Sequence, residues 1–533
     1  MIMERFEVIV IGAGPAGLSA AIEAASNGMQ VVVFDENSRP GGQLFKQIHK
    51  FFGSKEHRAK ERGFKIGEQL LKDAESLGVK VILDAQVIGI FQNREVSVMQ
   101  GDRIRHYRAN AIVIATGASE NMVPFDGWTL PGVIGAGAAQ TMMNIHGIKP
   151  GDRVLMVGSG NVGLVVGYQL MQAGCRLEAV IDAAPRVGGY GVHAAKIARM
   201  GVPFYMSHTI AQAHGAECVE GATIVEVDEN WQKVPGSEKH LDVDTICMAV
   251  GLSPMSQLAR VVGCQVEDNP QKGGMVPVCN AYGETSVPGI FAAGDVAGIE
   301  EASSAMIQGK IAGAAISFAQ GYISEEDFNR RYQSYNSSLG QLREGTFGHK
   351  NKGRTDVTAT DEGYTLSQNL FAKGYVEDAE ITRYPGIPAK ERLGQGLMPV
   401  IECTQNIPCN PCQDACNKGC IKVGSTITNL PVIDPSAKCS GCGMCVVSCS
   451  GQAIFLVDEN YSPGYAAISL PYELNPLPDK ENVGFALDRS GAVLGEAEVI
   501  SVRKTAAMDE TAILTMKVPV EWSMKARFFR PAK

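Results

Sequence analysis

Nine of the fourteen cysteines in this 533-residue chain lie between Cys403 and Cys449. They form two runs with the same ending, C-x5-C-x2-C-x3-C followed by C-x2-C-x2-C-x3-C. The second spacing is typical of sites that hold a [4Fe-4S] cluster through four thiolates. The first run is Cys403, Cys409, Cys412 and Cys416, and the second is Cys439, Cys442, Cys445 and Cys449. The doubled spacing therefore predicts two [4Fe-4S] clusters and transfer of single electrons.

Zinc and disulfides are the alternatives for so many cysteines. Zinc sites use two C-x2-C pairs and do not need a three-residue third gap repeated in both runs. Disulfides need an oxidising compartment, whereas the five cysteines scattered outside this segment favour a reducing cytoplasm. Iron–sulfur clusters explain the spacing better than either.

The two runs resemble a two-cluster ferredoxin module, in which the fourth cysteine of each run ligates the other cluster. The resemblance assigns one cluster to Cys403, Cys409, Cys412 and Cys449, and the other to Cys439, Cys442, Cys445 and Cys416. Cys420 stands where the second run has Ala453, so we expect it not to be a ligand. The match departs from the module in one respect, because Asn417 and Ser450 replace the usual proline after each fourth cysteine.

A dinucleotide-binding pattern begins the chain. Residues 6–11 predict a buried parallel strand, a glycine-rich loop and an Ala-rich helix follow, and a second strand over Val31–Phe34 ends at an acid. In this pattern the glycines allow a tight turn, close approach of the pyrophosphate and close helix packing, and the acid binds a ribose hydroxyl. The candidate residues are Gly12, Gly14, Pro15, Ala16, Gly17, Asp35 and Glu36.

The same pattern recurs in the middle of the chain. Arg153–Val157 predicts a strand, a helix runs to about Ala173, and Leu177–Ile181 predicts the second strand. The acid at its end favours NAD over NADP, although Arg186 nearby keeps NADP open. A scaffold role, or a fixed nucleotide such as ATP, is the alternative to a working NAD(H) site. The candidate residues are Gly158, Gly160, Asn161, Val162, Gly163 and Asp182.

Further motifs make the chain resemble the flavoproteins with two dinucleotide-binding domains, the glutathione reductase and thioredoxin reductase superfamily. The resemblance implies FAD in the first fold, with Asp295 on the ribityl chain and a helix from about Ala302 directed at the flavin. Neither fold carries a C-x-x-C pair, so we expect no redox disulfide beside the flavin. The motif residues are Gly42, Gln43 and Leu44, then Ala115, Thr116 and Gly117, then Gly294 and Asp295.

One branch of that superfamily is more similar, the α-type subunits of sarcosine oxidase, opine oxidase, hydrogen cyanide synthase and dye-linked proline dehydrogenase. The resemblance rests on residues 158–164, 184–193, 294–302 and 401–412. It implies a second flavoprotein subunit of the D-amino-acid-oxidase type, which takes hydride from the substrate amine, and it leaves FMN at a partner interface open. The two predicted clusters depart from an oxygen-using oxidase and favour a dehydrogenase, with a ferredoxin-like protein as a further electron carrier.

Composition limits the partners and the location. The formal net charge of −9 argues against nucleic acid or an anionic membrane surface. No uncharged apolar run reaches the roughly 18 residues of a membrane span. Charged residues among the first seven positions argue against a signal peptide, so we expect a cytoplasmic protein.

The expected fold class is α/β, with two Rossmann-like dinucleotide-binding domains, then a two-cluster ferredoxin-like α+β domain and a small β-domain. We expect an FAD-binding domain over 1–120 and 275–325, an NAD-binding domain over 121–274, a connector over 326–398, the cluster domain over 399–458 and the β-domain over 459–533. Within this frame Ser324 begins a short helix, residues 345–363 form an exposed connector, and a proline-containing stretch over 463–478 leads to the last strands.

No general acid or base can be assigned from the sequence. His193 has a suitable pKa, but a lone histidine is more often structural. Glu300 and Glu301 fit a helix start better than a flavin contact. The predicted function is an FAD- and iron–sulfur-dependent oxidoreductase subunit of an amino-acid dehydrogenase complex for proline, hydroxyproline, sarcosine or opines. The alternatives are a stand-alone NAD(P)H:ferredoxin-type oxidoreductase, similar to the small subunit of glutamate synthase, and a non-catalytic electron-transfer subunit.

Overall fold

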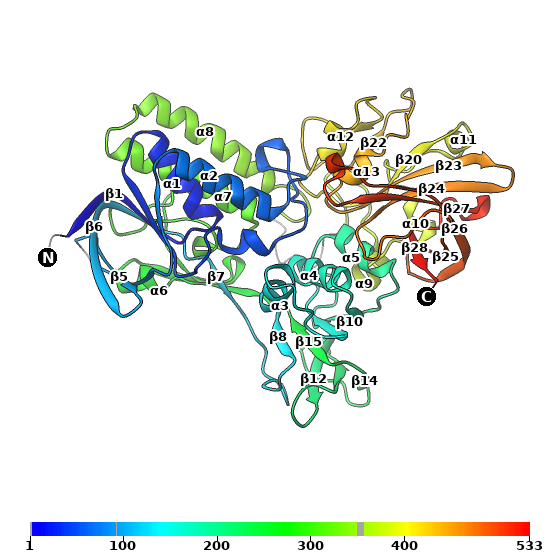
Figure 1. The fold of residues 1–533 in the computed structure, drawn as a ribbon, viewed down its shortest axis with the longest axis horizontal. Helices are drawn as coiled ribbons and strands as arrows, with labels where there is room; N and C mark the ends of the chain where they lie inside the picture. Colours follow the sequence, from blue (N-terminus) through cyan, green and yellow to red (C-terminus); the bar gives the residue numbers. More distant parts are fainter. Residues whose placement is uncertain (1–2, 92, 349–356, 533) are drawn as a thin grey trace. The chain divides into compact units, whose positions relative to one another are not determined.

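The computed structural model describes residues 3–91, 93–348 and 357–532. The chain divides into two compact units, each built from two segments (Figure 1). The first unit, called the flavin-fold unit here, comprises Met1–Asn121 and Gly251–Arg343. The second, called the cysteine unit, comprises Met122–Val250 and Glu344–Lys533. These units divide the chain differently from the five domains expected from the sequence, whose boundaries stay a prediction.

A mixed sheet covered by helices forms the flavin-fold unit, with parallel pairing among β1, β2, β3, β6 and β19 and antiparallel pairing where β5 joins β6 and β4. The strand order is β3-β2-β1-β6-β5-β4, and β19 adds to β6. Residues Val8 to Ile11 of β1 are buried because helices and strands cover both faces of the parallel part of the sheet. The strands are β1 (Glu4–Ile11), β2 (Val31–Phe34), β3 (Lys80–Ile82), β4 (Gln86–Ile90), β5 (Glu95–Gln100), β6 (Arg103–Ile114) and β19 (Ile290–Ala292).

Two helices of this unit pack unusually closely, α1 (Pro15–Ser26) and α7 (Ala302–Ala319). Pro15 suits the first helical position, where its missing N–H costs nothing. A Cβ at Gly309 of α7 would lie 2.1 Å from the carbonyl oxygen of Ala16, so only glycine permits this approach. The predicted start of α7 at Ala302 is confirmed.

The short helix expected after Ser324 is wrong in length. Helix α8 runs over Glu325–Leu342, 18 residues, and the Ser324 hydroxyl accepts the Asp327 N–H at 3.1 Å. Its sequence is mostly polar, and of its residues only Phe328 and Leu339 are buried. The helix cap could therefore be predicted from the sequence. The length of the helix could not, because a helix that buries so few side chains has a weak apolar pattern.

A second parallel sheet, of order β11-β10-β9-β15-β8, begins the cysteine unit. Its strands are β8 (Val133–Gly135), β9 (Arg153–Val157), β10 (Arg176–Asp182), β11 (Phe204–Met206) and β15 (Thr245–Met248). Helices α3 (Ala136–Asn144), α4 (Asn161–Gln172) and α5 (Gly191–Ala198) accompany it, with a meander of β12 (His208–His214), β13 (Gly221–Glu226) and β14 (Lys239–Leu241). Both Rossmann-like folds expected from the sequence are confirmed.

A seven-stranded antiparallel sheet completes the cysteine unit, in the order β20-β23-β24-β27-β26-β25-β28. Strands β20 (Met398–Ile401) and β23 (Ile454–Ser462) pair directly, and the cysteine segment connects them. Residues 399–458 and 459–533 therefore contribute to one sheet. The other strands are β24 (Tyr465–Tyr472), β25 (Val483–Leu487), β26 (Val493–Arg503), β27 (Ala512–Pro519) and β28 (Phe528–Pro531). Strand β24 occupies much of the stretch that we expected only to lead to the last strands.

The exposed connector expected over 345–363 is confirmed only in part, as far as the segment is described, because residues 358, 359 and 361–363 are exposed. Thr346 and Thr360 are buried, and a Cβ at Gly345 would lie 2.3 Å from the carbonyl oxygen of Asn406. Residues 349–356 lie outside the described part. A small helix, α9 (Gln368–Lys373), follows.

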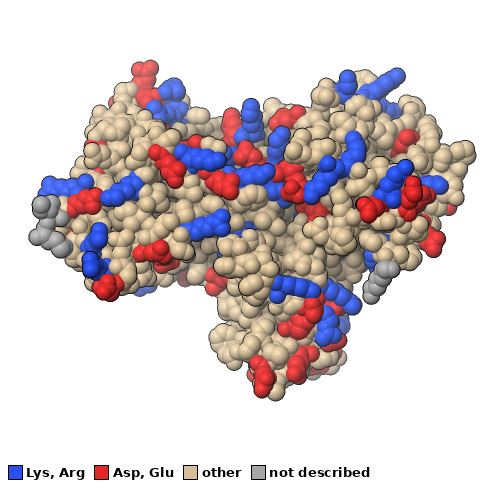
Figure 2. All heavy atoms as spheres, in the orientation of Figure 1, with Lys and Arg blue, Asp and Glu red and all other residues tan. Residues whose placement is uncertain are grey.

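Two surface properties complete the description. On the face shown in Figure 2, basic and acidic side chains are interspersed. Within the described ranges, every helix is too short or too polar to cross a bilayer.

Candidate cofactor sites

The three glycines of the first loop have the geometry that a nucleotide site requires. Gly12 has a φ of +103°, and a Cβ there would lie 2.4 Å from the Ala115 carbonyl oxygen. A Cβ at Gly17 would lie 1.9 Å from the carbonyl oxygen of Gly12. Gly14, in contrast, has open space where its Cβ would stand. Gly12 and Gly17 thus allow close backbone packing at the turn, and Gly14 leaves room for a phosphate at the N-terminus of α1.

The other predicted flavin motifs converge on the same helix start. A Cβ at Gly42 would lie 2.9 Å from the Cα of Gly14, and one at Gly294 would lie 2.8 Å from the Cβ of Ala16. Leu44 is buried and Gln43 is exposed. The sequence places these motifs more than 250 residues apart, and the fold brings them around one point.

The Ala115-Thr116-Gly117 motif ends β6 in the same unit. The Thr116 hydroxyl donates to the carbonyl oxygen of Met255 at 2.8 Å, so this motif ties the end of β6 to the returning segment of the unit. Ala115 is buried and Gly117 has a φ of +72°.

Asp35 holds the first loop in place. Its Oδ2 accepts the backbone N–H of Ala13 at 2.6 Å, and its Oδ1 accepts that of Asn37 at 2.9 Å. The side chain is buried, while Glu36 is exposed. A carboxylate has about four acceptor sites, so these bonds leave Asp35 able to accept a ribose hydroxyl as well.

The second loop repeats the construction. Gly158 and Gly163 would each place a Cβ about 2 Å from a carbonyl oxygen, 2.2 Å and 2.1 Å respectively, and Gly160 has open space. Asn161 Oδ1 accepts the Tyr190 N–H at 2.8 Å, and Val162 is exposed.

Asp182 is the acid of this second fold. Its Oδ1 accepts the Ala184 N–H at 2.9 Å. The guanidinium of Arg186 lies over the ring of Phe371, 5.3 Å from its centre, which gives it a role in packing this unit.

Asp295 begins a polar network at the start of α7. Its Oδ1 accepts the Glu300 N–H at 3.2 Å. The Glu300 carboxylate pairs with Arg343, with a Nε–Oε2 distance of 2.9 Å, and accepts Gln308 Nε2 at 3.2 Å. Gln308 Oε1 in turn accepts the Gly294 N–H at 2.9 Å. Glu300 thus links the turn at Asp295 to Gln308 of α7 and to Arg343.

The cysteine segment brings the second predicted ligand set together. Four cysteines line one cavity of the cysteine unit with Cys420, namely Cys416, Cys439, Cys442 and Cys445. Short helices α12 (Pro411–Ala415) and α13 (Met444–Ser448) of the two runs pack against each other. A cysteine of the first run therefore lies with three of the second, as the crossed assignment predicts.

The first predicted set is more deeply buried. Burial and the facing Cys449 raise the pKa of Cys403 to about 12. Burial raises the pKa of Cys412 as well, and Cys449 and Cys403 add to the effect. These three thiols therefore influence one another electrostatically. Cys409, the fourth member, has its N–H bonded to the Ile427 carbonyl at 2.8 Å.

Several backbone N–H groups point at cysteine sulfurs. Cys416 Sγ accepts the Cys420 N–H at 3.2 Å, Cys449 Sγ accepts the Ala453 N–H at 3.3 Å, and Cys439 Sγ accepts the Gly441 N–H at 3.4 Å. Burial raises the pKa of Cys416, but the N–H groups bonded to its sulfur outweigh this effect and lower the pKa below its usual value. Burial raises the pKa of Cys420 to about 11. Cys416 is therefore the better thiolate of this pair.

Among the described residues, no three His, Cys, Asp or Glu side chains stand close enough to share one metal ion. A cubane cluster binds each thiolate through a different iron atom, so its ligands stand further apart than those of a single ion. Sulfurs that accept backbone N–H groups around a common cavity fit such a cluster, whose properties depend on these bonds. The clusters themselves stay a prediction.

The cysteine segment packs directly on the second nucleotide fold. The Tyr168 hydroxyl of α4 donates to Gln452 Oε1 at 3.1 Å, and Arg199 Nη1, just after α5, donates to the Gln452 carbonyl at 3.0 Å. The Gly191 N–H donates to Gln405 Oε1 at 2.7 Å. His193 on α5 is 2% exposed, which suits the structural role expected for it.

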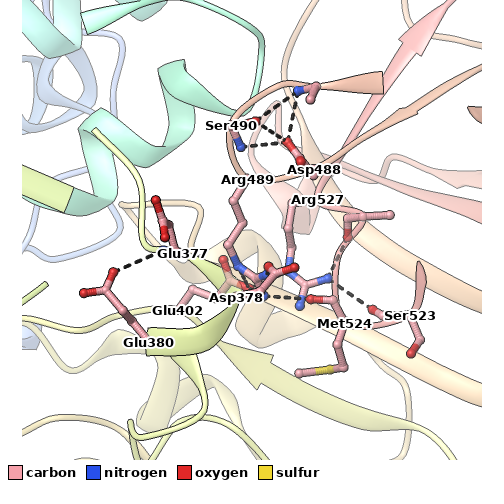
Figure 3. A network of polar contacts seen from close by, with 12 residues as sticks. Glu377, Asp378, Glu380, Glu402, Asp488, Arg489, Ser490, Ser523, Met524 and Arg527 are labelled. Atoms are coloured by element: carbon pink, nitrogen blue, oxygen red, sulfur yellow. Dashed lines mark hydrogen bonds and ion pairs between the residues drawn. The ribbon is translucent and has the colours of Figure 1, made fainter. Parts of the chain in front are cut away.

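A buried ionic cluster around Glu402, the residue before Cys403, was not predicted from the sequence (Figure 3). Glu402 Oε1 accepts Arg489 Nε at 3.0 Å and Nη2 at 2.6 Å, and it also accepts Arg527 Nε. Arg489 pairs in addition with Asp378. Burial alone would raise the pKa of Glu402, but the two arginines hold it at about 2. Arg489 and Arg527 lie 87 and 125 residues from Glu402 in the sequence, so no local sequence pattern predicts their pairing with it.

Two nucleotide-binding folds, with flavin motifs gathered at the first, define a flavin-dependent oxidoreductase with a second nucleotide site. Residues 6–309 match the pyridine nucleotide-disulphide oxidoreductase family. Because the match covers more than half of the chain, the protein belongs to this family. It is an FAD-dependent oxidoreductase.

The relatives fit this class. An opine oxidase subunit of Agrobacterium tumefaciens is 29% identical over 340 residues, covering 58% of this chain and 65% of that protein. The HcnB subunit of hydrogen cyanide synthase of Pseudomonas aeruginosa is 28% identical over 353 residues, covering 63% and 76%. The match therefore spans less than two thirds of the opine oxidase protein. The crystal structure of T. acidophilum thioredoxin reductase shares the fold, with a TM-score of 0.50 and 22% identity over 60% of this chain and 99% of that one.

Proposed function

We propose that this chain is the electron-transferring subunit of a dehydrogenase complex that oxidises an amino acid of the proline, hydroxyproline, sarcosine or opine type. The family supports the flavin chemistry. The names of the relatives, which are subunits of opine oxidase and of hydrogen cyanide synthase, support work within a complex. The cysteine segment, with its two predicted clusters, distinguishes the proposed dehydrogenase from an oxygen-using oxidase.

One observation carries this proposal. Cys416 of the first run lines a cavity with Cys439, Cys442 and Cys445 of the second. Folding thus gathers these four thiols from both runs, beside Cys420, which zinc sites built on C-x2-C pairs do not require. We assign Cys403, Cys409, Cys412 and Cys449 to the other [4Fe-4S] cluster.

The residues of the two folds have separate tasks in this proposal. The open side of Gly14 receives the FAD pyrophosphate, Asp35 a ribose hydroxyl, and Asp295 the ribityl chain. The open side of Gly160 receives NAD(H), with Asp182 at its ribose. When bound, FAD exchanges hydride with one partner and single electrons with another, which is the chemistry needed between a nicotinamide and one-electron carriers.

The substrate is assigned to a partner in this proposal. A second flavoprotein of the D-amino-acid-oxidase type takes the hydride from the amine, and a ferredoxin-like protein is a further carrier. Co-purification tests this arrangement, because a second flavoprotein at equal stoichiometry is expected. Its absence from the active preparation would favour a stand-alone oxidoreductase instead.

The decisive experiment uses anaerobically purified protein and NADH. We expect the visible flavin absorbance to bleach and an EPR signal of reduced clusters to follow. If NADH changes neither while dithionite reduces both, the second fold does not work as an NAD site. If dithionite produces no cluster signal from protein that contains flavin, the iron–sulfur part of the proposal is wrong.

A further inference from the structure

A second cavity of the cysteine unit is lined by cationic groups. Its walls carry three guanidinium groups and the hydroxyl side chains of Thr404 and Tyr375. The three arginines are all buried, with exposed fractions of 0% for Arg527, 5% for Arg489 and 6% for Arg199. Arginine is almost never buried to this extent unless negative charge lies close to it.

The described carboxylates do not balance these charges. Glu402 is the only acid among the described residues that line the cavity, and its one oxygen Oε1 serves both Arg489 and Arg527. Asp378 pairs with Arg489 from outside the lining, and its side chain is 53% exposed. Three positive and two negative groups leave one positive charge in excess. A buried charge without a counterion is strongly unfavourable.

Two guanidinium nitrogens in this cluster also lack an acceptor. Arg199 Nε and Arg527 Nη2 are buried, and no described residue accepts a hydrogen bond from either. Both guanidinium groups lie against Phe455, at 5.3 Å and 5.0 Å from the centre of its ring. The ring offers them no conventional acceptor, and a buried donor left unsatisfied is unfavourable.

We propose that this cavity binds a monovalent inorganic anion of the size of chloride. The space holds about one water-sized group, which is too little for a phosphate or an amino-acid carboxylate. A water molecule would accept the two N–H groups but would leave the excess charge unbalanced. An anion satisfies both requirements, and Arg489, Arg527 and Arg199 supply the charge that holds it.

The site stands beside the first predicted cluster. Thr404 directly follows Cys403, and Arg199 donates to the carbonyl of Gln452, three residues after Cys449. The negative charge of a bound cluster is therefore the rival source of compensation. The two sources are distinguished by locating the anion itself.

Bromide replaces chloride and scatters X-rays anomalously near its absorption edge. Crystals of the anaerobically purified protein, with its cofactors as isolated, are transferred to bromide in place of chloride. We expect an anomalous peak within hydrogen-bonding distance of Arg527 Nη2 or Arg199 Nε. Bromide peaks elsewhere but none in this cavity would overturn the proposal and leave compensation to the cluster. This result is independent of NADH oxidation, so it stands or fails separately from the proposed function.

A solution measurement complements the crystals. At equal ionic strength, we expect the unfolding temperature in chloride to exceed that in gluconate by roughly 2 °C, because the anion binds only the folded protein. Arg527→Met should abolish the difference. Arg530→Met, three residues on and exposed, is the matched control and should retain it. Equal unfolding temperatures in the two salts for the unmodified protein would contradict the proposal.

Discussion

The carboxylate of Asp182 accepts two hydrogen bonds from Ser159 through the same oxygen, one from the backbone N–H at 2.7 Å and one from the hydroxyl at 2.6 Å. The acid of the second fold thereby fixes the glycine loop that precedes it. In the first fold Asp35 makes the equivalent bond to Ala13. Each acid thus positions its loop before it meets any nucleotide, so its loss should disturb the pyrophosphate end of the site as well as the ribose end.

This arrangement predicts the effect of Asp182→Asn. The amide keeps the shape of the side chain but loses the charge that strengthens the bonds to Ser159. We expect the NADH concentration for half-maximal flavin reduction to rise about tenfold, the equivalent of roughly 1.4 kcal/mol. Flavin content should stay unchanged, since the first fold is intact. Anaerobic NADH titration followed by flavin absorbance measures both, and an unaltered titration would count against Asp182 as part of the site.

Two glycines of the same loop should respond differently to substitution. A Cβ at Gly160 would meet no protein atom within 4 Å and needs no positive φ, so Gly160→Val should fold normally and yet lose flavin reduction by NADH. Gly163→Val would collide with the Gly158 carbonyl oxygen, so we expect poor expression or a lower unfolding temperature. Thermal unfolding and NADH reduction, measured on both variants, separate a filled ligand space from a broken packing contact. Full NADH activity in Gly160→Val would show that no phosphate binds there.

The flavin site can be tested at Asp295. Asp295→Ala removes the carboxylate assigned to the ribityl chain, and we expect most of the bound flavin to be lost on purification. Asp268→Ala, on an exposed strand of the same unit, is the control and should keep its flavin. The ratio of visible to ultraviolet absorbance reports the occupancy. Full occupancy in the Asp295 variant would contradict the assignment.

Cys416 and Cys420 provide a matched pair for the cluster assignment. Cys416→Ser should lose about half of the bound iron, because one of two four-iron clusters loses a ligand. Cys420→Ser should keep the full iron content, since Cys420 stands where the second run has Ala453. Iron and acid-labile sulfide analysis after anaerobic purification compares the two. The reverse order of iron loss would make Cys420 the ligand and Cys416 the spare thiol.

Stability of the flavin-fold unit should depend on the protonation of His57. Burial lowers the pKa of this histidine, and its neutral ring bonds Ser54 through Nδ1 at 3.0 Å and the Ser338 carbonyl through Nε2 at 3.0 Å. A depressed pKa in the folded state means that this contribution is present above pH 6.5, the unfolded value, and is lost as the pH falls towards the folded value.

The expected slope is less than the ~1.4 kcal/mol per pH unit that one fully excluded proton gives. Thermal unfolding between about pH 7.5 and 5.5 measures it. His57→Gln should flatten this part of the profile, and His146→Gln, exposed in the other unit, should leave it unchanged. Parallel profiles for His57→Gln and the unmodified protein would assign the dependence to other groups.

The sequence predicted what short-range stereochemistry dictates. A glycine loop such as that around Gly14 is recognisable because Gly12 and Gly17 avoid clashes with nearby carbonyl oxygens, while Gly14 leaves its Cβ position open. The Ser324 cap was recognisable because it too is a local contact. The cluster of Glu402 with Arg489 and Arg527 was not, because charged residues far apart in the sequence give no periodic signal. The pairing of β20 with β23 was hidden too, since the cysteine segment separates the strands.

That pairing has a consequence for how the protein is assembled. Ile401 and Ile454 are partners in the sheet, so the chain leaves for the cysteine segment and returns from it at neighbouring positions. A short hairpin turn between these two residues would close the sheet without changing its strand order. The cysteine segment is in this sense a separable module. An ancestor or an engineered form could gain or shed it as a unit while keeping the surrounding sheet.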